Sequence, residues 1–435
     1  MNNVGISNWS GSRTLAGTVV TPTTLDEAAD AVARSSHVRA LGSRHSFNDI
    51  ADSEETLLNL AHLAYRHPRL STPTDGDAPP SSVEPELDES TGRVRVTGST
   101  RYADLALFLH DRGRTLPNFA SLPHISVAGS VATGTHGSGI GNASLASSVV
   151  GMELLTADGS VRTLTDADAE LDGARVALGA LGVVTAVTLQ SVPAFDVAQT
   201  VYGPAGFDDV VAAFEEVSGL GYSVSCFTTL REDTFASIWV KRAGGELEDA
   251  WPAQVAGSRA MSEPFHPIPG VDPANATQQL GAAGPSWDRL PHFRADHMPS
   301  AGEEIQCEYL VPRQHAVRAL EAFRELSGPL AGLVQVAEVR SIAADTAWMS
   351  PMYQQDCLAF HFTLVRDNER VAAALPHLDA AFGPVEGRPH WGKVFDADPQ
   401  RVRGLYPRRS DFVDLARDLD PQGTFTNAFL RRWVF

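Results

Sequence analysis

The sequence predicts an α+β protein with two domains. Its 435 residues are more than a single hydrophobic core usually serves. Short β-like runs alternate with helical stretches up to Ser191–Phe195, and beyond that point longer helices separate the strands. We therefore expect one domain over residues 1–195, a second domain over residues 196–388, and a C-terminal segment over residues 389–435.

Local patterns predict the elements of the first domain. Leu25–Arg34 has two acidic residues in its first turn and Thr23 or Thr24 as a cap, which predicts a helix. Tyr102–Arg112 places apolar residues at i, i+3, i+4 and i+7, so one side of a second helix is apolar. Apolar and β-branched runs predict strands at Val38–Leu41, Val94–Gly98, Gly151–Thr156 and Val183–Gln190.

The second domain is expected to combine longer helices with strands. Helices are predicted at Phe207–Val217 and His315–Ser327, and strands at Ile305–Leu310 and Leu333–Arg340. Back in the first domain, Arg66–Glu89 is rich in Pro, Ser, Asp and Gly, which predicts a surface loop or insertion.

Composition and charge exclude several classes of partner. The chain is 43% hydrophobic and carries 53 acidic against 34 basic residues, for a net charge of −19. Such a surface repels phosphate backbones and anionic lipid, so neither nucleic acid nor a membrane is expected as a partner. The chain has no run of eighteen apolar residues, and Met1–Ser7 lacks the basic and apolar regions of a secretory signal. We expect a cytoplasmic monomer.

The three cysteines predict no disulfide framework. Cys226, Cys307 and Cys357 are odd in number, lie far apart and form no C-x-x-C pair, so a zinc ribbon is not indicated either. We expect each to be a small buried residue, and we expect no metal site.

Arg39–Phe47 is the first candidate functional segment. A strand runs into a turn of small residues at Gly42 and Ser43 and then presents Arg44 and His45. Such a turn bares consecutive backbone N–H groups, which bind phosphate oxygens. An ordinary turn with a surface histidine has the same sequence, so this segment alone leaves both interpretations open.

Ala120–Gly139 is the second candidate segment. It has almost no large or charged side chains, and its four glycines make helix propensity poor. A backbone this bare suits close approach by a large ligand, although a glycine-rich packing loop has the same pattern. The chain has no G-x-G-x-x-G between a strand and a helix and no G-x-x-x-x-G-K-[ST], which disfavours a Rossmann or Walker nucleotide fold.

Two strands in the second domain carry polar residues at a spacing of two. Residues two apart on a strand share a face, so Glu338 lies beside Arg340, and His361 beside Thr363. In a cavity these groups could hydrogen-bond hydroxyl groups. On a solvated face the acid and the guanidinium would form a surface ion pair worth less than ~1 kcal/mol. The pattern alone leaves both a wet pocket and a solvated sheet face open.

Arg388–Lys393 is the fourth candidate segment. A proline and a glycine fix a compact turn that places His390, Trp391 and Lys393 together. An exposed loop with a solvated lysine is the alternative.

Together these segments resemble the vanillyl-alcohol oxidase flavoprotein superfamily, and within it the alditol oxidases and sugar-1,4-lactone oxidases. The resemblance implies an FAD-binding domain of the PCMH type with two subdomains, to which the C-terminal segment returns, and a cap domain with a large antiparallel sheet. The matching motifs occur in the same order: Arg39–Phe47, Ala120–Gly139, Leu178–Val183, Glu338–Arg340 and Arg388–Lys393, with Trp287–Phe293 and Glu308–Pro312 also alike.

The resemblance also implies roles for individual residues. His45 matches the histidine that is bonded covalently to FAD, and Val183 matches a position near the adenine. Glu338, Arg340 and Lys393 match catalytic positions. The polyol pocket would comprise Ser121, Glu338, Arg340, His361, Thr363 and Lys393. The remaining FAD-binding positions would be Ala40, Leu41, Gly42, Ser43, Arg44, Ser46, Ser121, Ser126, Val127, Gly129, Ser130, Thr133, Gly134, Thr135 and His136.

The activity implied by this resemblance is that of an FAD-dependent oxidase. It would oxidise the terminal primary hydroxyl of an alditol such as xylitol or sorbitol to the aldose, by hydride transfer to flavin N5, and reduce O2 to hydrogen peroxide. A lactone oxidase or dehydrogenase acting on gulono- or arabinono-lactone is the alternative enzyme, although Trp287–Phe293 favours alditols. A non-catalytic binding protein is the alternative from another class.

Overall fold

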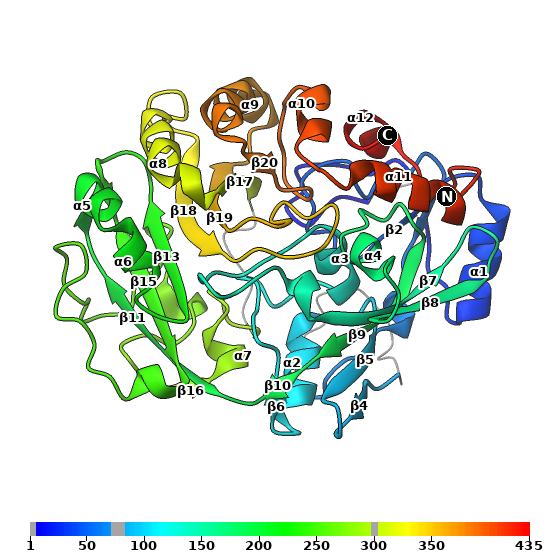
Figure 1. Ribbon diagram of the computed structural model, residues 1–435, viewed down its shortest axis with the longest axis horizontal. Helices are drawn as coiled ribbons and strands as arrows, with labels where there is room; N and C mark the ends of the chain where they lie inside the picture. The colour runs from blue at the N-terminus through cyan, green and yellow to red at the C-terminus, as the bar shows by residue number, and fades with distance from the viewer. Residues whose placement is uncertain (1–5, 71–82, 297–302) are drawn as a thin grey trace.

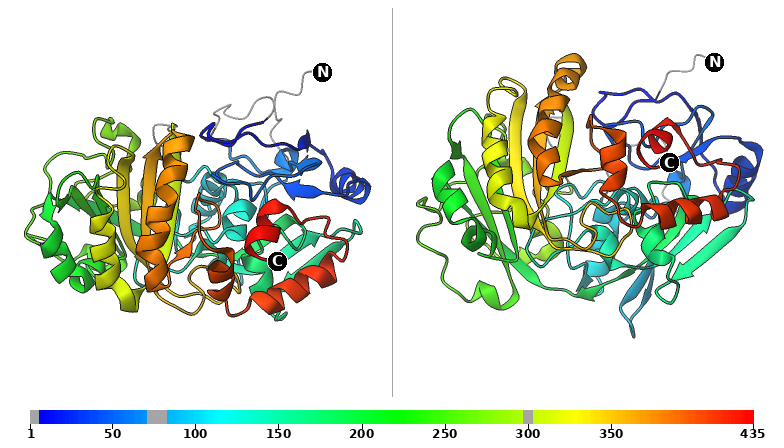
Figure 2. Two further views of the ribbon diagram at one scale, coloured as in Figure 1. Left: turned by 90° about the horizontal axis from the view of Figure 1, so that it is seen from above. Right: turned by 45° about the horizontal axis from the view of Figure 1, so that its top comes forward.

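Three sheets, of three, five and eight strands, organise the chain in the computed structural model, which describes residues 6–70, 83–296 and 303–435 (Figure 1). The two smaller sheets and the C-terminal helices lie in one half of the molecule, and the eight-stranded sheet forms the other half. The same division is visible from above (Figure 2). The predicted α+β class is confirmed.

The three-stranded sheet is parallel, with the strand order β1-β3-β2. Helix α1 has the predicted bounds; it begins at Leu25 because Thr24 Oγ1 accepts a hydrogen bond from the backbone N–H of Glu27 at 3.1 Å. Strand β2 ends directly before the small-residue turn, so it delivers this turn to the interior of the molecule. The bounds are Thr18–Val20 for β1, Leu25–Arg34 for α1, Val38–Ala40 for β2 and Thr56–Leu58 for β3.

The five-stranded sheet is antiparallel, with the order β4-β5-β9-β7-β8. The poor helix propensity of segment 120–139 argued against a helix there, but Val127–Ala132 forms helix α3. Its Val127 and Val131 are fully buried, and this packing outweighs the weak local preference. The strands are β4 Glu86–Asp88, β5 Arg93–Thr97, β7 Val149–Leu155, β8 Val161–Thr165 and β9 Val183–Gln190; the helices are α2 Tyr102–His110, α3 Val127–Ala132 and α4 Leu171–Arg175.

The predicted surface insertion Arg66–Glu89 is only partly a loop. Residues 71–82 lie outside the described residues. On one side of them His67 is buried, and its backbone N–H donates to Asp104 Oδ1 at 2.7 Å. On the other side β4 pairs with β5. The composition of the segment as a whole therefore hid two structured ends.

The eight-stranded sheet is antiparallel throughout, with the order β16-β11-β15-β13-β18-β19-β17-β20. Alternate residues of β17, such as Cys307 and Tyr309, pack with Phe323 of α8 and Phe382 of α9, so these helices cover one face of the sheet. The strands are β11 Asp196–Tyr202, β13 Ser223–Thr228, β15 Ser237–Ala243, β16 Gly284–Pro285, β17 Glu304–Pro312, β18 Val334–Ile342, β19 Cys357–Val365 and β20 Arg388–Pro389.

One predicted helix of this half is broken. Phe207–Val217 forms two short helices that separate at Ala213, and each buries its own phenylalanine and valine. All three cysteines are free and buried, as predicted. The helices are α5 Phe207–Ala212, α6 Phe214–Ser218, α7 Ser286–Arg289, α8 Ala316–Glu325 and α9 Asn368–Phe382. The described residues contain no helix long and apolar enough to cross a membrane.

The C-terminal helices pack with the first half of the chain. Phe412, Phe429 and Trp433 belong to the same hydrophobic core as residues of β7 and β9. A second core holds most of the eight-stranded sheet and its helices. These two cores support the domain bounds 1–195, 196–388 and 389–435, which stay a proposal. The helices are α10 Pro399–Gly404, α11 Arg409–Leu419 and α12 Ala428–Trp433. The minor strand pairs are β6 Arg114–Thr115 with β10 Val192–Pro193, and β12 Ala205–Gly206 with β14 Thr234–Phe235.

Candidate active site

A large cavity lies between the first half of the chain and the eight-stranded sheet. One side of the cavity is lined by residues from 40–47 and 120–136, which we call the loop wall. The other side is lined by polar residues of β17, β18 and β19, which we call the cap wall: Gln306, Glu308, Glu338, Arg340, His361 and Thr363. The turn after β20 adds His390 and Lys393 to the lining, and Val183 of β9 also reaches the cavity.

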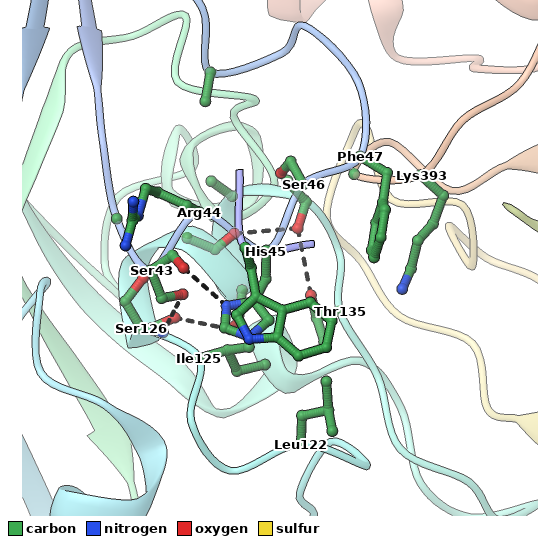
Figure 3. A pocket seen from close by; sticks show the side chains of 18 of the residues that line it. Ser43, Arg44, His45, Ser46, Phe47, Leu122, Ile125, Ser126, Thr135 and Lys393 are labelled. Atoms are coloured by element: carbon green, nitrogen blue, oxygen red, sulfur yellow. Dashed lines mark hydrogen bonds between the residues drawn. The ribbon is translucent and has the colours of Figure 1, made fainter. Parts of the chain in front are cut away.

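The loop wall begins with the turn that follows β2 (Figure 3). Ser43 Oγ accepts a hydrogen bond from the backbone N–H of Ser126 at 3.1 Å, which joins the two segments of this wall. A Cβ atom on Gly42 would lie 2.6 Å from Ser126 Oγ, so glycine allows this close approach. Arg44 has a φ of 63°, in the left-handed region. Successive backbone N–H groups of the turn therefore do not alternate in direction as they would in a strand.

His45 is held firmly in this turn. Its Nδ1–H donates to the carbonyl oxygen of Ser43 at 2.9 Å, and Trp9 stacks on its ring with centroids 5.1 Å apart. Its Nε2 is buried and has no hydrogen-bond partner among the residues that the structure describes. Burial lowers the pKa of His45 to about 3, so the imidazole is neutral at physiological pH.

The sequence of the glycine-rich segment 120–139 allowed either a ligand-binding loop or a packing loop, and the structure shows a lining part and a packing part. Its part from Ala120 to His136 supplies lining residues to the cavity. Gly137 and Gly139 are packing residues instead, because a Cβ atom there would lie 2.4 Å from the carbonyl oxygen of Phe119 and 2.3 Å from that of Tyr222.

Two predicted cofactor-binding residues lie outside the cavity lining. The side chain of Val127 belongs to the hydrophobic core, and Gly134 lies against Pro351 and Val176. The structure therefore gives no support to direct contact of these two residues with the cofactor. Val127 lies in α3 and Gly134 lies just after its end, and both pack away from the cavity. The other predicted site residues line the cavity.

Strand register brings the cap wall together. His361 of β19 lies opposite Glu308 on one neighbouring strand and opposite Glu338 on the other, while Thr363 lies opposite Gln306. Because side chains at paired positions point to the same face, the polar residues of three strands form one surface. The predicted pocket is thus favoured over a solvated sheet face, and its charged residues are nearly fully buried.

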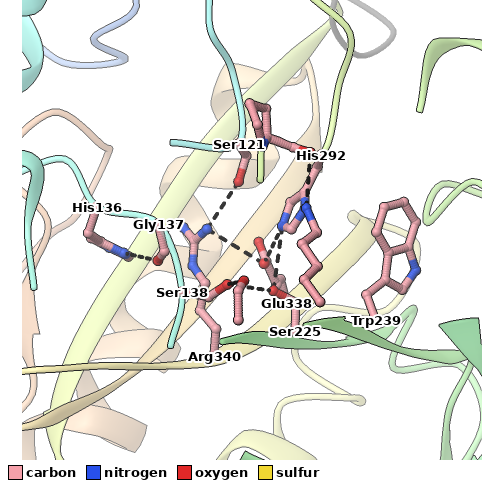
Figure 4. Close-up of polar contacts among 12 residues, drawn as sticks. Ser121, His136, Gly137, Ser138, Ser225, Trp239, His292, Glu338 and Arg340 are labelled. Carbon is pink, nitrogen blue, oxygen red and sulfur yellow. Dashed lines mark hydrogen bonds and ion pairs between the residues drawn. The ribbon is translucent and has the colours of Figure 1, made fainter. Parts of the chain in front are cut away.

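Arg340 is the centre of the cap wall (Figure 4). Its guanidinium donates to Glu308 Oε1 at 3.0 Å and to Ser121 Oγ at 3.1 Å, and it lies 3.5 Å from Glu338 Oε1. Burial raises the pKa of Glu338, but Arg340 and then His292 lower it, and the net pKa lies well below the usual range. Burial also raises the pKa of Glu308, and His136 and Arg340 more than offset this effect. Both carboxylates are therefore ionised.

Lys393 faces the cap wall from the turn after β20. Its ammonium donates to Gln306 Oε1 and lies 5.2 Å from the ring centroid of Phe47. Burial lowers the pKa of Lys393. Burial also lowers the pKa of His361 to about 3 and that of His390 to about 3, so both imidazoles are neutral. The alternative of an exposed loop is excluded for this segment, since Trp391 is fully buried.

Sequence reasoning missed Gln306, Glu308 and His292 as lining residues. The first two follow the same spacing of two that identified the other strands, so the pattern was available on β17. No spacing signals His292, which reaches the cavity from the chain that follows α7.

His136, Glu308 and His390 place ligand atoms within 4.8 Å of one another, a distance at which they could hold a cation. Glu308 already accepts a hydrogen bond from Arg340, and that guanidinium would repel a metal ion. We therefore assign no metal to this group.

The residues of the cavity fit FAD. The loop wall offers backbone amides and small side chains, and it includes Gly42, where a Cβ atom would be too close to Ser126. A bare backbone of this kind allows close binding of a dinucleotide. His45 lines the same cavity, and its Nε2 is buried and without a hydrogen-bond partner in the described part of the chain. Two cations, Arg340 and Lys393, lie at the opposite side, where they could stabilise negative charge.

Comparison with known proteins defines the class. Residues 84–165 match the family model "FAD binding domain", and residues 298–433 match "D-arabinono-1,4-lactone oxidase". The fold is similar to that of cholesterol oxidase from B. sterolicum, with a TM-score of 0.77 at 15% identity, covering 99% of this chain and 96% of that chain. The fold and these matches are those of an FAD-dependent oxidoreductase of the vanillyl-alcohol oxidase type.

Curated relatives define the family more narrowly. An alditol oxidase from a Streptomyces strain is 46% identical over 99% of each chain. An L-gulono-1,4-lactone dehydrogenase from Mycobacterium tuberculosis is 29% identical over 98% of each chain, and mouse L-gulonolactone oxidase is 24% identical over 94% of this chain and 93% of its own. The chain belongs to the alditol oxidase family.

Proposed function

We propose that the protein oxidises the terminal primary hydroxyl of an alditol, such as xylitol or sorbitol, to the aldose while O2 is reduced to hydrogen peroxide. The observation that carries this proposal is the cap wall, where buried carboxylates, a guanidinium and hydroxyls face one cavity. The 46% identity to an alditol oxidase supports the same substrate class.

The polar groups of the cavity suit a neutral polyol. A hydroxyl both donates and accepts a hydrogen bond, so its site needs donors and acceptors next to each other. Glu338 accepts, Arg340 donates, and Ser121 and Thr363 can do either. Arg340 is already paired with two carboxylates, so it offers hydrogen bonds without an uncompensated charge. A buried site of this kind rejects analogues that lack the hydroxyls.

Catalysis would divide between the cofactor and the two cations. Bound FAD supplies the hydride acceptor and passes the electrons to O2. Arg340 is a cation before the reaction and could stabilise negative charge that develops on the bound cofactor, and Lys393 could do the same once it has taken up a proton. The substrate hydroxyl must lose a proton, and we assign its acceptance to Lys393 with Gln306.

His45 is proposed as the covalent attachment point of the FAD. Its neutral imidazole keeps a lone pair for bond formation, and the hydrogen bond to Ser43 together with the stacked Trp9 restricts its ring. The C–N bond would form at the free lone pair of Nε2, with loss of one hydrogen from the cofactor carbon and one from the imidazole; the two protons and two electrons released would reduce O2 to hydrogen peroxide.

Acid precipitation tests the covalent bond. Wild-type protein should retain yellow flavin in the pellet, whereas His45→Ala should release all of it into the supernatant. His62→Ala is the matched control because His62 lies on a short 3-10 helix that does not line the cavity. Flavin that stays in the pellet of His45→Ala would refute the assignment.

A substrate panel read by peroxide tests the activity. Xylitol and sorbitol should give hydrogen peroxide at a higher kcat/KM than L-gulono- or D-arabinono-1,4-lactone. Higher kcat/KM with a lactone would instead favour the alternative that the match over residues 298–433 suggests. Protein without any flavin would support a binding protein.

Two further expectations accompany this proposal. The protein is expected to be a monomer, which size-exclusion chromatography with light scattering can test. It is also expected to act in the cytoplasm, which fractionation of the producing cells can test.

A further inference from the structure

Lys241 lies behind the cap wall and has no role in the function proposed above. It belongs to β15, is 1% exposed and does not line the cavity. The sequence contains two lysines, Lys241 and Lys393; Lys241 is buried and Lys393 is partly buried in the same region, while all the other basic Lys/Arg positions are arginines. Because burying an amine is costly, its position needs a physical reason.

Three acceptors surround the amine of Lys241. Its Nζ lies 2.6 Å from the carbonyl oxygen of Leu290, 3.0 Å from that of Pro291 and 3.2 Å from Nδ1 of His292. An ammonium group has three N–H donors and no acceptor, so three acceptors match its protonated form. His292 Nδ1 therefore accepts a hydrogen bond through its lone pair.

This contact decides which nitrogen of His292 carries the proton. Burial lowers the pKa of His292 to about 4, so the ring is neutral and has one N–H. Since Nδ1 accepts, the proton is on Nε2, which donates to Glu338 Oε1 at 2.9 Å (Figure 4). Phe227 and Trp239 contact the ring edge-on, each with a centroid distance of 5.5 Å, and fix its plane.

The charges of the cap wall explain why Glu338 needs this support. The guanidinium of Arg340 serves two buried carboxylates, and it is closer to Glu308 than to Glu338. Lys241 brings a second cation to Glu338, with His292 as the bridge. A buried carboxylate without such compensation would take up a proton.

We propose that Lys241 is a positioning residue that fixes the Nε2–H tautomer of His292 and thereby holds Glu338 ionised and oriented toward a substrate hydroxyl. This inference rests on the proposed function, because that function assigns Glu338 to the substrate. Lys241 acts through His292 and touches neither cofactor nor substrate.

The arrangement makes substrate affinity depend on pH. Burial lowers the pKa of Lys241 to about 7; Glu338 raises this pKa and Arg340 lowers it, while Gln199 and Ser223 on the paired strands are uncharged. A neutral amine has a lone pair that favours a proton on His292 Nδ1. The lone pair of Nε2 would then face the Glu338 carboxylate and repel it. KM for the alditol should be constant below pH about 7 and rise above it.

The first experiment does not depend on the substrate. Holoenzyme labelled with 15N-histidine, without alditol, is compared with Lys241→Met by NMR, and His292→Gln assigns the signal. Wild type should show the Nε2–H tautomer at pH 6 and lose it as the pH rises to 9, and Lys241→Met should lack it at pH 6. An unchanged tautomer in Lys241→Met would overturn the inference.

The second experiment measures kinetics with xylitol from pH 6 to 9. Lys241→Met should raise KM about tenfold, or about 1.4 kcal/mol, with kcat changed less than about twofold and no further rise of KM with pH. His292→Phe should behave alike, and the double variant should be no worse than either single one. His292→Gln should recover part of the loss because its amide can donate to Glu338.

Matched outcomes separate the two proposals. Tyr309→Phe, which removes a buried hydroxyl on the opposite face of β17, should leave KM unchanged. Additive losses in the double variant would mean that Lys241 is merely structural. Absence of alditol oxidation together with the expected tautomer change would refute the proposed function and leave the Lys241–His292 pair intact. If Lys241→Met does not fold, the His292 variants and their pH profiles decide the question.

Discussion

The two walls of the cavity differ in the chemical groups that line them. The loop wall uses backbone groups and small side chains, and its closest approaches are those of Gly42 and Ser126. The cap wall uses long charged side chains that are held by one another, with Arg340 bonded to Glu308 and close to Glu338. The loop wall should therefore be sensitive to an added Cβ atom, and the cap wall to a removed charge.

The difference reflects what each wall is proposed to bind. A large planar cofactor with a diphosphate needs space and amide donors, which a bare backbone supplies. A small polyol needs several hydrogen bonds that point to one place, and polar side chains on adjacent strands can provide them because they face the same cavity. Disruption of one wall should leave the other wall's function measurable, which gives the comparison its tests.

The largest effect is expected for Arg340→Met. It leaves Glu308 and Glu338 buried without their shared cation, a change that costs about 3–5 kcal/mol. We expect kcat/KM to fall at least ~10³-fold, and the melting temperature to fall as well. Arg95→Met is the control, because the Arg95–Glu153 pair is partly exposed and should be worth less than about 1 kcal/mol. Equal losses in both variants would contradict a special role for the cap wall.

The same variant should weaken the dependence of stability on pH. In the wild type the folded-state pKa values of Glu308 and Glu338 are depressed, so their contribution is present above the unfolded value of about 4.3 and is lost as the pH falls. Without Arg340, both carboxylates lose one of the groups that lower their pKa values, so both pKa values should rise and stability should gain less as the pH rises above that value. Melting temperatures between pH 3 and 7 would show the two slopes.

A smaller loss is expected for Lys393→Met. If Lys393 accepts the hydroxyl proton, the rate of flavin reduction should fall about 10²- to 10⁴-fold, with flavin content unchanged. In the wild type this rate should rise with pH through the lowered pKa of Lys393, because the neutral amine is the acceptor, and the variant should lose this limb. Stopped-flow absorbance measures both, and a wild-type rate in the variant would remove Lys393 from catalysis.

The packing that supports the loop wall is tested by Gly137→Ala, which changes the residue directly after the end of this wall at His136. The added Cβ atom would lie 2.4 Å from the carbonyl oxygen of Phe119, so the backbone beside His136 must shift, at a cost of about 1–3 kcal/mol. We expect a lower melting temperature and a lower ratio of flavin to protein absorbance. Gly141→Ala is the control because its Cβ atom would meet nothing within 4 Å. The same flavin ratio in both variants would contradict the close packing of this wall.

The smallest effect is expected for Thr363→Val. It removes one hydroxyl from the cap wall without changing side-chain size, and the loss of one hydrogen bond costs about 0.5–1.5 kcal/mol. KM for the alditol should rise about two- to tenfold with an unchanged flavin spectrum. Thr363→Ser should restore most of the affinity, and failure to do so would point to the methyl group instead of the hydroxyl.

Sequence patterns predicted some elements of the fold correctly and missed others. The helix Leu25–Arg34 and the strand Val183–Gln190 were predicted with their observed bounds because capping and β-branched patterns act locally. The helix Phe207–Val217 was predicted unbroken, since nothing in its sequence marks the break at Ala213. Helix α3 was not predicted because its burial, and not its propensity, stabilises it.

The sequence by itself determined the α+β class and the spacing of polar residues on β18 and β19, and it predicted the candidate FAD-binding motifs, because these depend on residue type and on spacing along one strand. Only the tertiary structure decided that β17 lies beside β19 and adds Glu308, and that Lys241 reaches Glu338 through His292. Such side-chain contacts join residues 46 or more positions apart. Strand order and loop path set them, and neither leaves a periodic signal in the chain.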